Sequence, residues 1–420
     1  MKMFANISRE LAGFSSREKK FLLAVMLCGF CISAEYSVTR PASTSIFLTT
    51  FSVKLYPYAW LLTVPLNFLV IYLYNRFLPK LGCLKTLFTI AAAATSVNVL
   101  FAYLLPHWPE LSFFHFMWKD IYILLMFKQL WSLIHMTISS SRAKYLYGLI
   151  FGMGGVGSVV GSLIPGFMSV KMGSANLFFL TLPIYSIAFA AYYFAWKRSE
   201  ITNASFQKVD PRPKEAFSLI RKSRFLAFIL FLVILMQVTT ALTDYQFNVY
   251  LERSISDLDL RTQYYGRLGS IISSVTVAVQ FLGAFLFMHF MGLRNTHLFV
   301  PALFLSNAAL FSLFPSFGMI SYQYVSIKAI DFSLFGIIRE VLYSPMKLDE
   351  KFRAKAVIDV FAYRSAKALA SFMLLFFQFA FASLILPMIT GLTMVLFFGW
   401  IVVVYRMFRT EELVTLNSTI

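Results

Sequence analysis

Charged side chains lie inside several of the long apolar stretches of this sequence. An ionisable group within a membrane span is costly and usually faces a cavity or pairs with another charge. The acids at such positions are Glu35, Asp120, Asp244, Asp331, Glu340 and Asp359, and the cations are Arg40, Lys128, Lys328, Arg339, Arg364 and Lys367. Partly desolvated Arg and Lys bind phosphate and carboxylate well. The pattern predicts either a polar cavity for an anion or a set of buried ion pairs.

The spacing of these charges indicates which of them share a helix face. Lys328 and Asp331 are three residues apart and can pair on one face. Asp331 precedes Arg339 by eight residues, and Asp120 precedes Lys128 by the same interval. We predict that the substrate-binding residues are Arg40, Lys128, Arg339, Lys367 and Arg364. We predict gating or proton-coupling roles for Glu35, Asp120, Asp244, Asp331, Glu340 and Asp359. The alternative is that these charges mainly neutralise one another and lock the two halves of the chain together.

The elements that carry these charges are predicted to be transmembrane helices. The 420 residues are 59% hydrophobic and only 13% charged, whereas a soluble protein of this size has about 25% charged residues. Backbone polar groups in lipid must be satisfied internally, so spans of this length are helices. We predict an all-α membrane protein with about twelve spans, near residues 20–38, 56–78, 86–105, 118–139, 147–170, 175–196, 224–248, 266–290, 295–315, 318–344, 355–383 and 386–407.

The distribution of Lys and Arg predicts the orientation of the chain. The formal net charge is +18, and the cations concentrate before the first span, in alternate loops and in the polar stretch 197–223. By the positive-inside rule, both termini are cytoplasmic. We therefore predict a multi-pass protein of the cell inner membrane.

The two halves of the sequence resemble each other. Asp120, Lys128 and the segment 142–144 recur 211 residues later as Asp331, Arg339 and 353–355, and Glu35 corresponds to Asp244 at an offset of 209. Two parallel six-helix repeats resemble the architecture of the major facilitator superfamily. The predicted domains are an N-terminal half at 1–196, a cytoplasmic linker at 197–223 and a C-terminal half at 224–420.

Glycines crowd the predicted fifth span, at Gly152, Gly154, Gly155, Gly157, Gly161 and Gly166. No Lys-Ser/Thr follows them, so a phosphate-binding loop is not indicated. Small residues on a membrane helix let two backbones approach closely. We predict close packing and sliding of helices at this span.

The segment 328–367 resembles the nucleotide transporters of the ATP/ADP translocase type. The matching residues include Arg339-Glu340, the run 355–360, Arg364 and Lys367, and in the first half the run 36–40 resembles the family's Tyr-Thr-x-x-Arg element. The resemblance implies a major-facilitator fold and transport of a nucleotide.

The sequence departs from this family in its first half. Pro41 replaces an Asp after the Arg, Ser43 stands where the family has a substrate-contacting Lys, and Gln129 stands where it has a Glu. ATP/ADP exchange therefore does not carry over directly. Whether the substrate is still a nucleotide is left open by these three positions.

The function predicted from these features is secondary transport of an anionic metabolite, with a nucleotide or related phosphorylated compound as the leading candidate. One alternative is proton-coupled transport of another solute, such as an amino acid, peptide or drug. Another is a membrane scaffold without transport activity. We expect no enzymatic activity, catalytic residues, cofactor, metal site or nucleic-acid partner, since no corresponding motif occurs. The expected partners are membrane lipid and a small anionic molecule, and we expect a monomer.

Overall fold

The computed structural model describes residues 15–138, 140–199, 221, 223–343, 358 and 362–409. Throughout this described part, the regular secondary structure is helical. Seven of its helices are long and apolar enough to cross a membrane. The chain is a multi-pass membrane protein, as the composition predicts.

Contacts divide the chain into two compact units. Unit 1 contains residues 1–51, 65–208 and 257–274, and unit 2 contains 52–64, 209–256 and 275–420. Each unit therefore includes a short segment from the other half of the sequence. The domain borders predicted from the sequence, at residues 196 and 224, stay a prediction.

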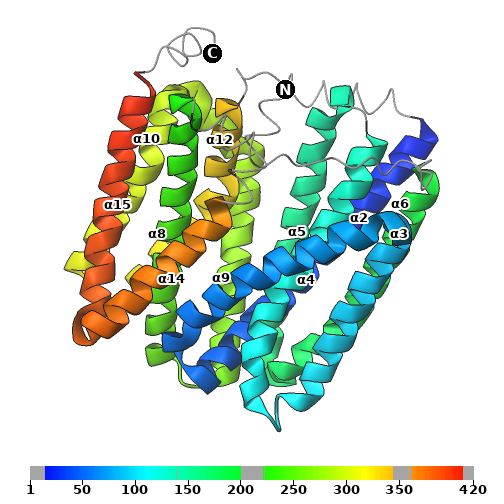
Figure 1. The fold of residues 1–420 in the computed structure, drawn as a ribbon, viewed down its shortest axis with the longest axis horizontal. Coiled ribbons are helices and arrows are strands. Elements are labelled where there is room, and N and C mark those ends of the chain that lie inside the picture. The colour runs from blue at the N-terminus through cyan, green and yellow to red at the C-terminus, as the bar shows by residue number, and fades with distance from the viewer. Residues whose placement is uncertain are drawn as a thin grey trace. The chain divides into compact units, whose positions relative to one another are not determined.

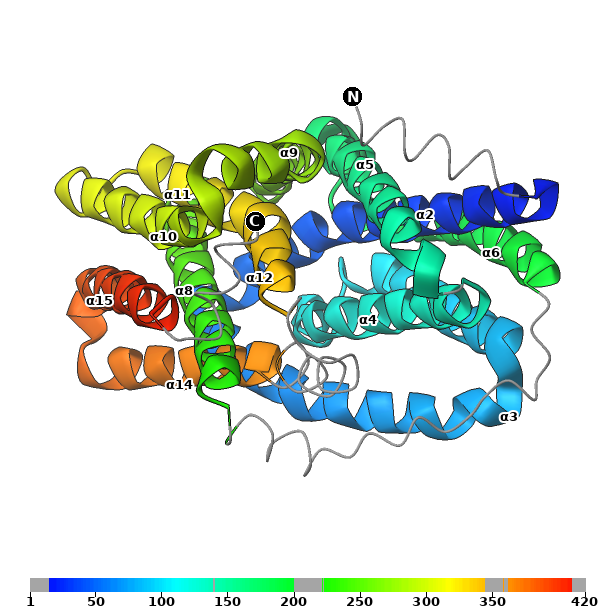
Figure 2. The ribbon, with the colours of Figure 1, turned by 90° about the horizontal axis from the view of Figure 1, so that it is seen from above.

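In unit 1, helix α2 (Ser16–Phe51) is the central helix (Figures 1 and 2). It packs against α4 (Ser112–Thr137), α5 (Ser140–Met172) and α6 (Thr181–Arg198), which follows the short 3-10 helix η3 (Ala175–Leu180). Buried apolar side chains of these helices form one core, which includes Val25, Tyr122 and Tyr192. Figure 2 shows α5 crossing α2.

The first predicted span was too short, because α2 continues to Phe51 rather than ending at 38. The polar run after Pro41 remains helical because its side chains find partners inside the protein. Thr49 and Thr50 donate hydrogen bonds to the carbonyls of Ser45 and Ile46, at 2.9 and 3.0 Å. Hydroxyl groups satisfied in this way can lie inside a membrane helix.

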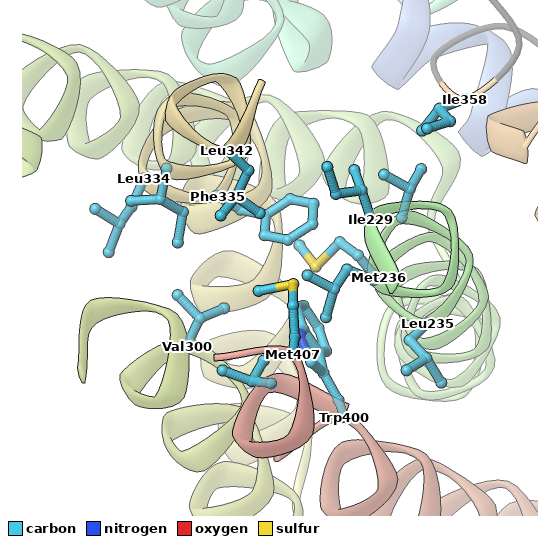
Figure 3. Packing of buried hydrophobic residues seen from close by; sticks show 14 of the residues in the cluster. Ile229, Leu235, Met236, Val300, Leu334, Phe335, Leu342, Ile358, Trp400 and Met407 are labelled. Carbon is cyan, nitrogen blue, oxygen red and sulfur yellow. The ribbon is translucent and has the colours of Figure 1, made fainter. Parts of the chain in front are cut away.

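In unit 2, helix α8 (Arg224–Ser254) takes the central position. It packs against α11 (Phe317–Ile330), α14 (Tyr363–Ala380) and α15 (Ile385–Met407), and Figure 1 shows α8 beside α15. Figure 3 shows the core of this unit, where Met236 of α8 lies among Phe335, Trp400 and Met407. In both units the first span thus packs against the fourth, fifth and sixth, which confirms the predicted repeat.

Two glycines provide a second sign of the repeat. Helix α3 (Tyr56–Leu104) is interrupted at Gly82, with φ 73° and ψ 171°, and α10 (Ala284–Leu313) is interrupted at Gly292, with φ 70° and ψ 167°. Only glycine adopts this backbone conformation readily. The two residues are 210 positions apart, and each separates two of the predicted spans. The exact number of twelve spans stays a prediction.

Unit 2 also contains wide helical turns. The α9 helix (Leu258–Ala278) reaches α10 through the π-helical turn η5 (Val279–Gly283), and α11 continues through a second one, η6 (Asp331–Phe335), into α12 (Gly336–Leu342). In unit 1, α4 is a continuous α-helix at the corresponding place. Turns of this kind accommodate extra residues and are frequent at functional sites.

The glycines of α5 allow close contact with α2, as predicted. A Cβ atom at Gly157 would lie 2.3 Å from the carbonyl oxygen of Phe30, and one at Gly161 would lie 2.2 Å from that of Ala34. These distances leave no room for a methyl group. The backbones of α2 and α5 therefore touch directly. Sliding of these helices stays a prediction.

We expect Gly161→Ala to lower the free energy of unfolding by about 1–3 kcal/mol, because the new methyl group would overlap the α2 backbone. The measurement is the melting temperature of the purified protein in detergent, followed by tryptophan fluorescence. The control is Gly148→Ala in the same helix, where a Cβ meets nothing within 4 Å. The control should melt at the wild-type temperature or slightly above it. Equal melting of both variants would contradict the direct backbone contact.

Candidate functional site

Glu35 lies at the centre of a buried polar cluster in unit 1, and its side chain is fully buried. Its carboxyl group accepts hydrogen bonds from uncharged donors on α2, α3, α4 and α6: Thr39 (2.7 Å), Asn98 (3.3 Å), Tyr122 (2.9 Å), Thr181 (2.9 Å) and Tyr185 (2.7 Å). Several donors on one carboxyl group offset the cost of burying it. This arrangement ties the central helix to three neighbours.

The cluster continues from Glu35 through Asn98 to His115. The Oδ1 atom of Asn98 lies 3.3 Å from Nε2 of His115, and Nδ1 of His115 lies 3.0 Å from Oγ of Ser43. An amide oxygen only accepts, so Nε2 is the donor, and in a neutral imidazole Nδ1 then accepts from the serine. Ser43, where the resembled family has a Lys, is thus part of an internal hydrogen-bond chain.

A second polar group of unit 1 surrounds Asp120. The Tyr36 hydroxyl donates to its Oδ1 at 3.0 Å, and Lys119 Nζ lies 3.4 Å from the same oxygen. Lys119 is buried, donates to the Phe116 carbonyl at 2.8 Å and lies 3.6 Å from the centre of the Phe116 ring. Lys119 was not among the residues predicted from the sequence.

The two cations predicted for unit 1 have polar and aromatic neighbours. Arg40 Nη2 lies 3.5 Å from the Tyr265 hydroxyl, and the guanidinium lies over the Tyr265 ring. Lys128 donates to Asn75 at 2.8 Å and lies 4.4 Å from the centre of the Tyr74 ring. The two cations therefore contact different elements, α9 for Arg40 and α3 for Lys128.

Gln129, which stands where the resembled family has a Glu, is fully buried. Its Nε2 atom donates to the Cys83 carbonyl at 2.9 Å and to the Tyr192 hydroxyl at 2.8 Å. Its Oε1 atom accepts from Tyr74 at 2.7 Å. An amide can donate and accept at once, whereas an ionised carboxylate can only accept. The neutral residue is therefore matched to these neighbours.

In unit 2, Asp244 of α8 forms an ion pair with Lys328 of α11, with 3.2 Å between Oδ2 and Nζ. Asn248 donates to Asp244 Oδ1 at 2.9 Å, and Lys328 lies 5.7 Å from the centre of the Tyr324 ring. Both charged side chains retain slight exposure, 15% for Asp244 and 10% for Lys328. The interaction joins the first and fourth spans of the second half.

Asp331 begins the π-helical turn η6 and accepts two hydrogen bonds from Gln237 Nε2, at 3.1 and 3.2 Å. Arg339 lies over the ring of Phe335, at 5.8 Å from its centre, and Glu340 is exposed. The turn thus begins at the predicted acid Asp331 and ends before the predicted cation Arg339.

Lys367 of α14 lies 5.0 Å from the centre of the Trp60 ring, a geometry suited to a cation–π interaction. Arg364 belongs to the same helix, but its side chain lies outside the described part. Asp359 also lies outside the described residues. The predicted binding roles of Arg40, Lys128, Arg339, Lys367 and Arg364 stay predictions.

Sequence reasoning missed several polar residues of these clusters. Asn98 and His115 carry no spacing that distinguishes them from other polar residues in apolar spans. Lys119 did leave a signal, because Lys328 follows it at an offset of 209, the offset that relates Glu35 to Asp244. Among the described residues, no group of three His, Cys, Asp or Glu side chains is placed to hold a metal ion.

Residues 316–410 match the family model of the TLC ATP/ADP transporters. This segment contains Lys328, Arg339 and Lys367, and the match confirms the resemblance predicted for the last third of the chain. A search of curated proteins finds no match.

Solved transporter structures share the fold. The nucleoside transporter NupG is 12% identical with a TM-score of 0.65, and the match covers 93% of this chain and 100% of that chain. A POT family transporter in complex with a thioalcohol conjugated peptide is 9% identical with a TM-score of 0.68, covering 92% and 96%. A bacterial metal transporter is 12% identical with a TM-score of 0.62, covering 95% and 100%.

At these identities the likeness establishes the fold alone, which is the predicted major-facilitator architecture. The matched family and the similar structures are transporters rather than enzymes. Together the comparisons support a transport function for a small molecule.

We expect Glu35→Ala to lower the free energy of unfolding by about 3 kcal/mol or more, because it leaves several buried donors without their acceptor. Tyr185→Phe removes one donor and should cost about 1 kcal/mol. Melting temperatures in detergent provide the measurement, and Glu110→Ala at an exposed carboxyl is the control. Wild-type stability of Glu35→Ala would show that this cluster does not hold the helices together.

Proposed function

We propose that this protein is a secondary transporter that moves an anionic metabolite, a nucleotide or related phosphorylated compound, across the cell inner membrane by alternating access. The observation that carries the proposal is the match of residues 316–410 to the TLC ATP/ADP transporters. The match falls on the part of the chain that holds Lys328, Arg339 and Lys367 within apolar helices. Cations in such positions are suited to phosphate groups.

The first half does not rank nucleotides by their number of phosphates. Ser43 and Gln129 stand at two positions where the resembled family is charged, and both engage in internal hydrogen bonds. Together with Pro41, these exchanges remove one Lys but also an Asp and a Glu, so cations are not lost relative to acids. We therefore propose a phosphorylated substrate without a preference among AMP, ADP and ATP.

Purified protein in liposomes should take up labelled AMP or ADP in a saturable manner. Arg339→Ala and Lys367→Ala should each lower the initial rate at least about tenfold, equivalent to roughly 1.4 kcal/mol of lost anion binding. Arg294→Ala is the matched control, since Arg294 is exposed and lies over the Tyr405 ring. Absence of uptake of AMP, ADP and ATP by correctly folded protein would refute the nucleotide proposal.

Proton-coupled transport of another solute is the second candidate, because the buried acid Glu35 begins a hydrogen-bond chain that reaches an imidazole. The same liposomes distinguish the two. Uptake of labelled amino acids or peptides that a proton uncoupler abolishes, without any nucleotide uptake, would favour this candidate.

We expect both termini in the cytoplasm. Green fluorescent protein fused after Ile420 should fluoresce, because it folds in the cytoplasm, and alkaline phosphatase at the same place should be inactive. A cysteine introduced at exposed Ser256 should react with a membrane-impermeant maleimide added outside the inner membrane. Active alkaline phosphatase at the C-terminus would reverse the proposed orientation.

A further inference from the structure

Lys119 and Lys328 occupy related positions in the two halves. They are 209 residues apart, the offset that also relates Glu35 to Asp244 and Tyr36 to Tyr245. Lys119 lies on α4 and Lys328 on α11, which are the fourth spans of their halves. The offset changes to 211 between Asp120 and Asp331, and the π-helical turn η6 begins at Asp331. A wide turn absorbs extra residues without ending the helix.

Both lysines are buried: counted over the whole residue, 3% of the surface of Lys119 and 8% of that of Lys328 is exposed. Among the residues whose burial is described, one other Lys or Arg is buried: Arg261, near the start of α9. Each of the two lysines contacts both an aspartate and an aromatic ring. Lys119 has Asp120 and Phe116, and Lys328 has Asp244 and Tyr324.

Buried ion pairs of this kind contribute little net stability to a fold. Desolvation of two charges offsets most of their attraction, and apolar residues of similar volume are often as stable. A chain with so much apolar surface could fill these positions with Leu or Met. A buried lysine beside an aspartate is nonetheless present at both related positions, although the two aspartates are not related by the repeat, and this indicates a role other than packing.

We propose that Lys328 binds the phosphate group of the transported anion, and that Asp244 is a counter-ion which the substrate displaces. This proposal rests on the proposed function, whose substrate is a phosphorylated anion. A phosphate carries up to two charges and three acceptor oxygens, so it competes well with one carboxylate for a lysine. The pair is not enclosed entirely by protein, since Asp244 keeps 15% exposure.

The two pairs differ in what their release would do. Lys119 and Asp120 are neighbours on one helix, so breaking their contact separates no helices. Lys328 and Asp244 join α11 to α8, and η6 follows three residues after Lys328. Displacement of Asp244 would thus loosen α11 beside its wide turn. The proposed binding at Lys328 is thus coupled to the contact between α11 and α8.

The decisive variant is Asp244→Asn, which removes the competitor and keeps the lysine. AMP and pyrophosphate should bind it more tightly than wild type, by about tenfold in Kd, while the rate of AMP uptake falls. A purely structural pair predicts the opposite, since its disruption would weaken binding. Equal or weaker binding of both probes by folded Asp244→Asn would overturn the role of Asp244 as a displaced counter-ion.

The double variant Asp244→Asn/Lys328→Met tests the lysine without leaving an unpaired charge. It should melt near the wild-type temperature in the absence of ligand and lose the rise in melting temperature that AMP and pyrophosphate cause. Such a rise reports affinity and ligand concentration. Lys328→Arg keeps the charge and should retain much of the shift.

The outcomes separate the two proposals. If the wild-type protein responds to AMP and the double variant responds equally well, Lys328 does not bind the substrate and only this inference fails. If the wild-type protein responds to neither AMP nor pyrophosphate and takes up no nucleotide, the proposed function fails, and this inference fails with it. Arg294→Ala should retain the wild-type response in every measurement.

Discussion

A charge buried in an apolar helix bundle is tolerated only beside suitable partners, and this constraint organises both units. In unit 1, Glu35 on the central helix draws donors from α3, α4 and α6. In unit 2, the central helix provides Asp244 for Lys328 and Gln237 for Asp331. The first span of each half is thus the centre of polar contacts as well as of apolar packing.

The same constraint affects the two units differently. The partners of Glu35 are neutral and come from several helices, so its position is fixed from many directions. The partners of Asp244 include the charged Lys328 and the amide of Asn248, and Asp244 keeps a small exposed surface. A carboxyl group surrounded by many short hydrogen bonds is costly to move, whereas an ion pair can exchange one charged partner for another. Under the proposed role of Lys328, the repeat-related acids are therefore fixed in unit 1 and exchangeable in unit 2.

Much of the fold follows from the sequence because lipid imposes strong rules on composition. The apolar stretches, the glycines of α5 and the offset near 210 all reflect physical limits on length, backbone approach and repeat geometry. The continuation of α2 past Pro41 did not follow, because some partners of its polar side chains, such as His115 for Ser43, are distant in sequence. The pairing of Lys328 with Asp244 did not follow either, since spacing along one helix indicates only local partners such as Asp331.

Lys119 shows how a local irregularity can hide a residue that the repeat relates to another. Comparison at the offset of 211 places Ile330 opposite Lys119, and the correspondence with Lys328 is lost. The offset changes between Lys328 and Asp331, at the end of α11 and directly before the wide turn at Asp331–Phe335, rather than in a loop. Unit 1 has an unbroken α-helix at the corresponding place. The repeat thus differs directly after the lysine that joins α11 to α8, where a moving helix would need an irregularity.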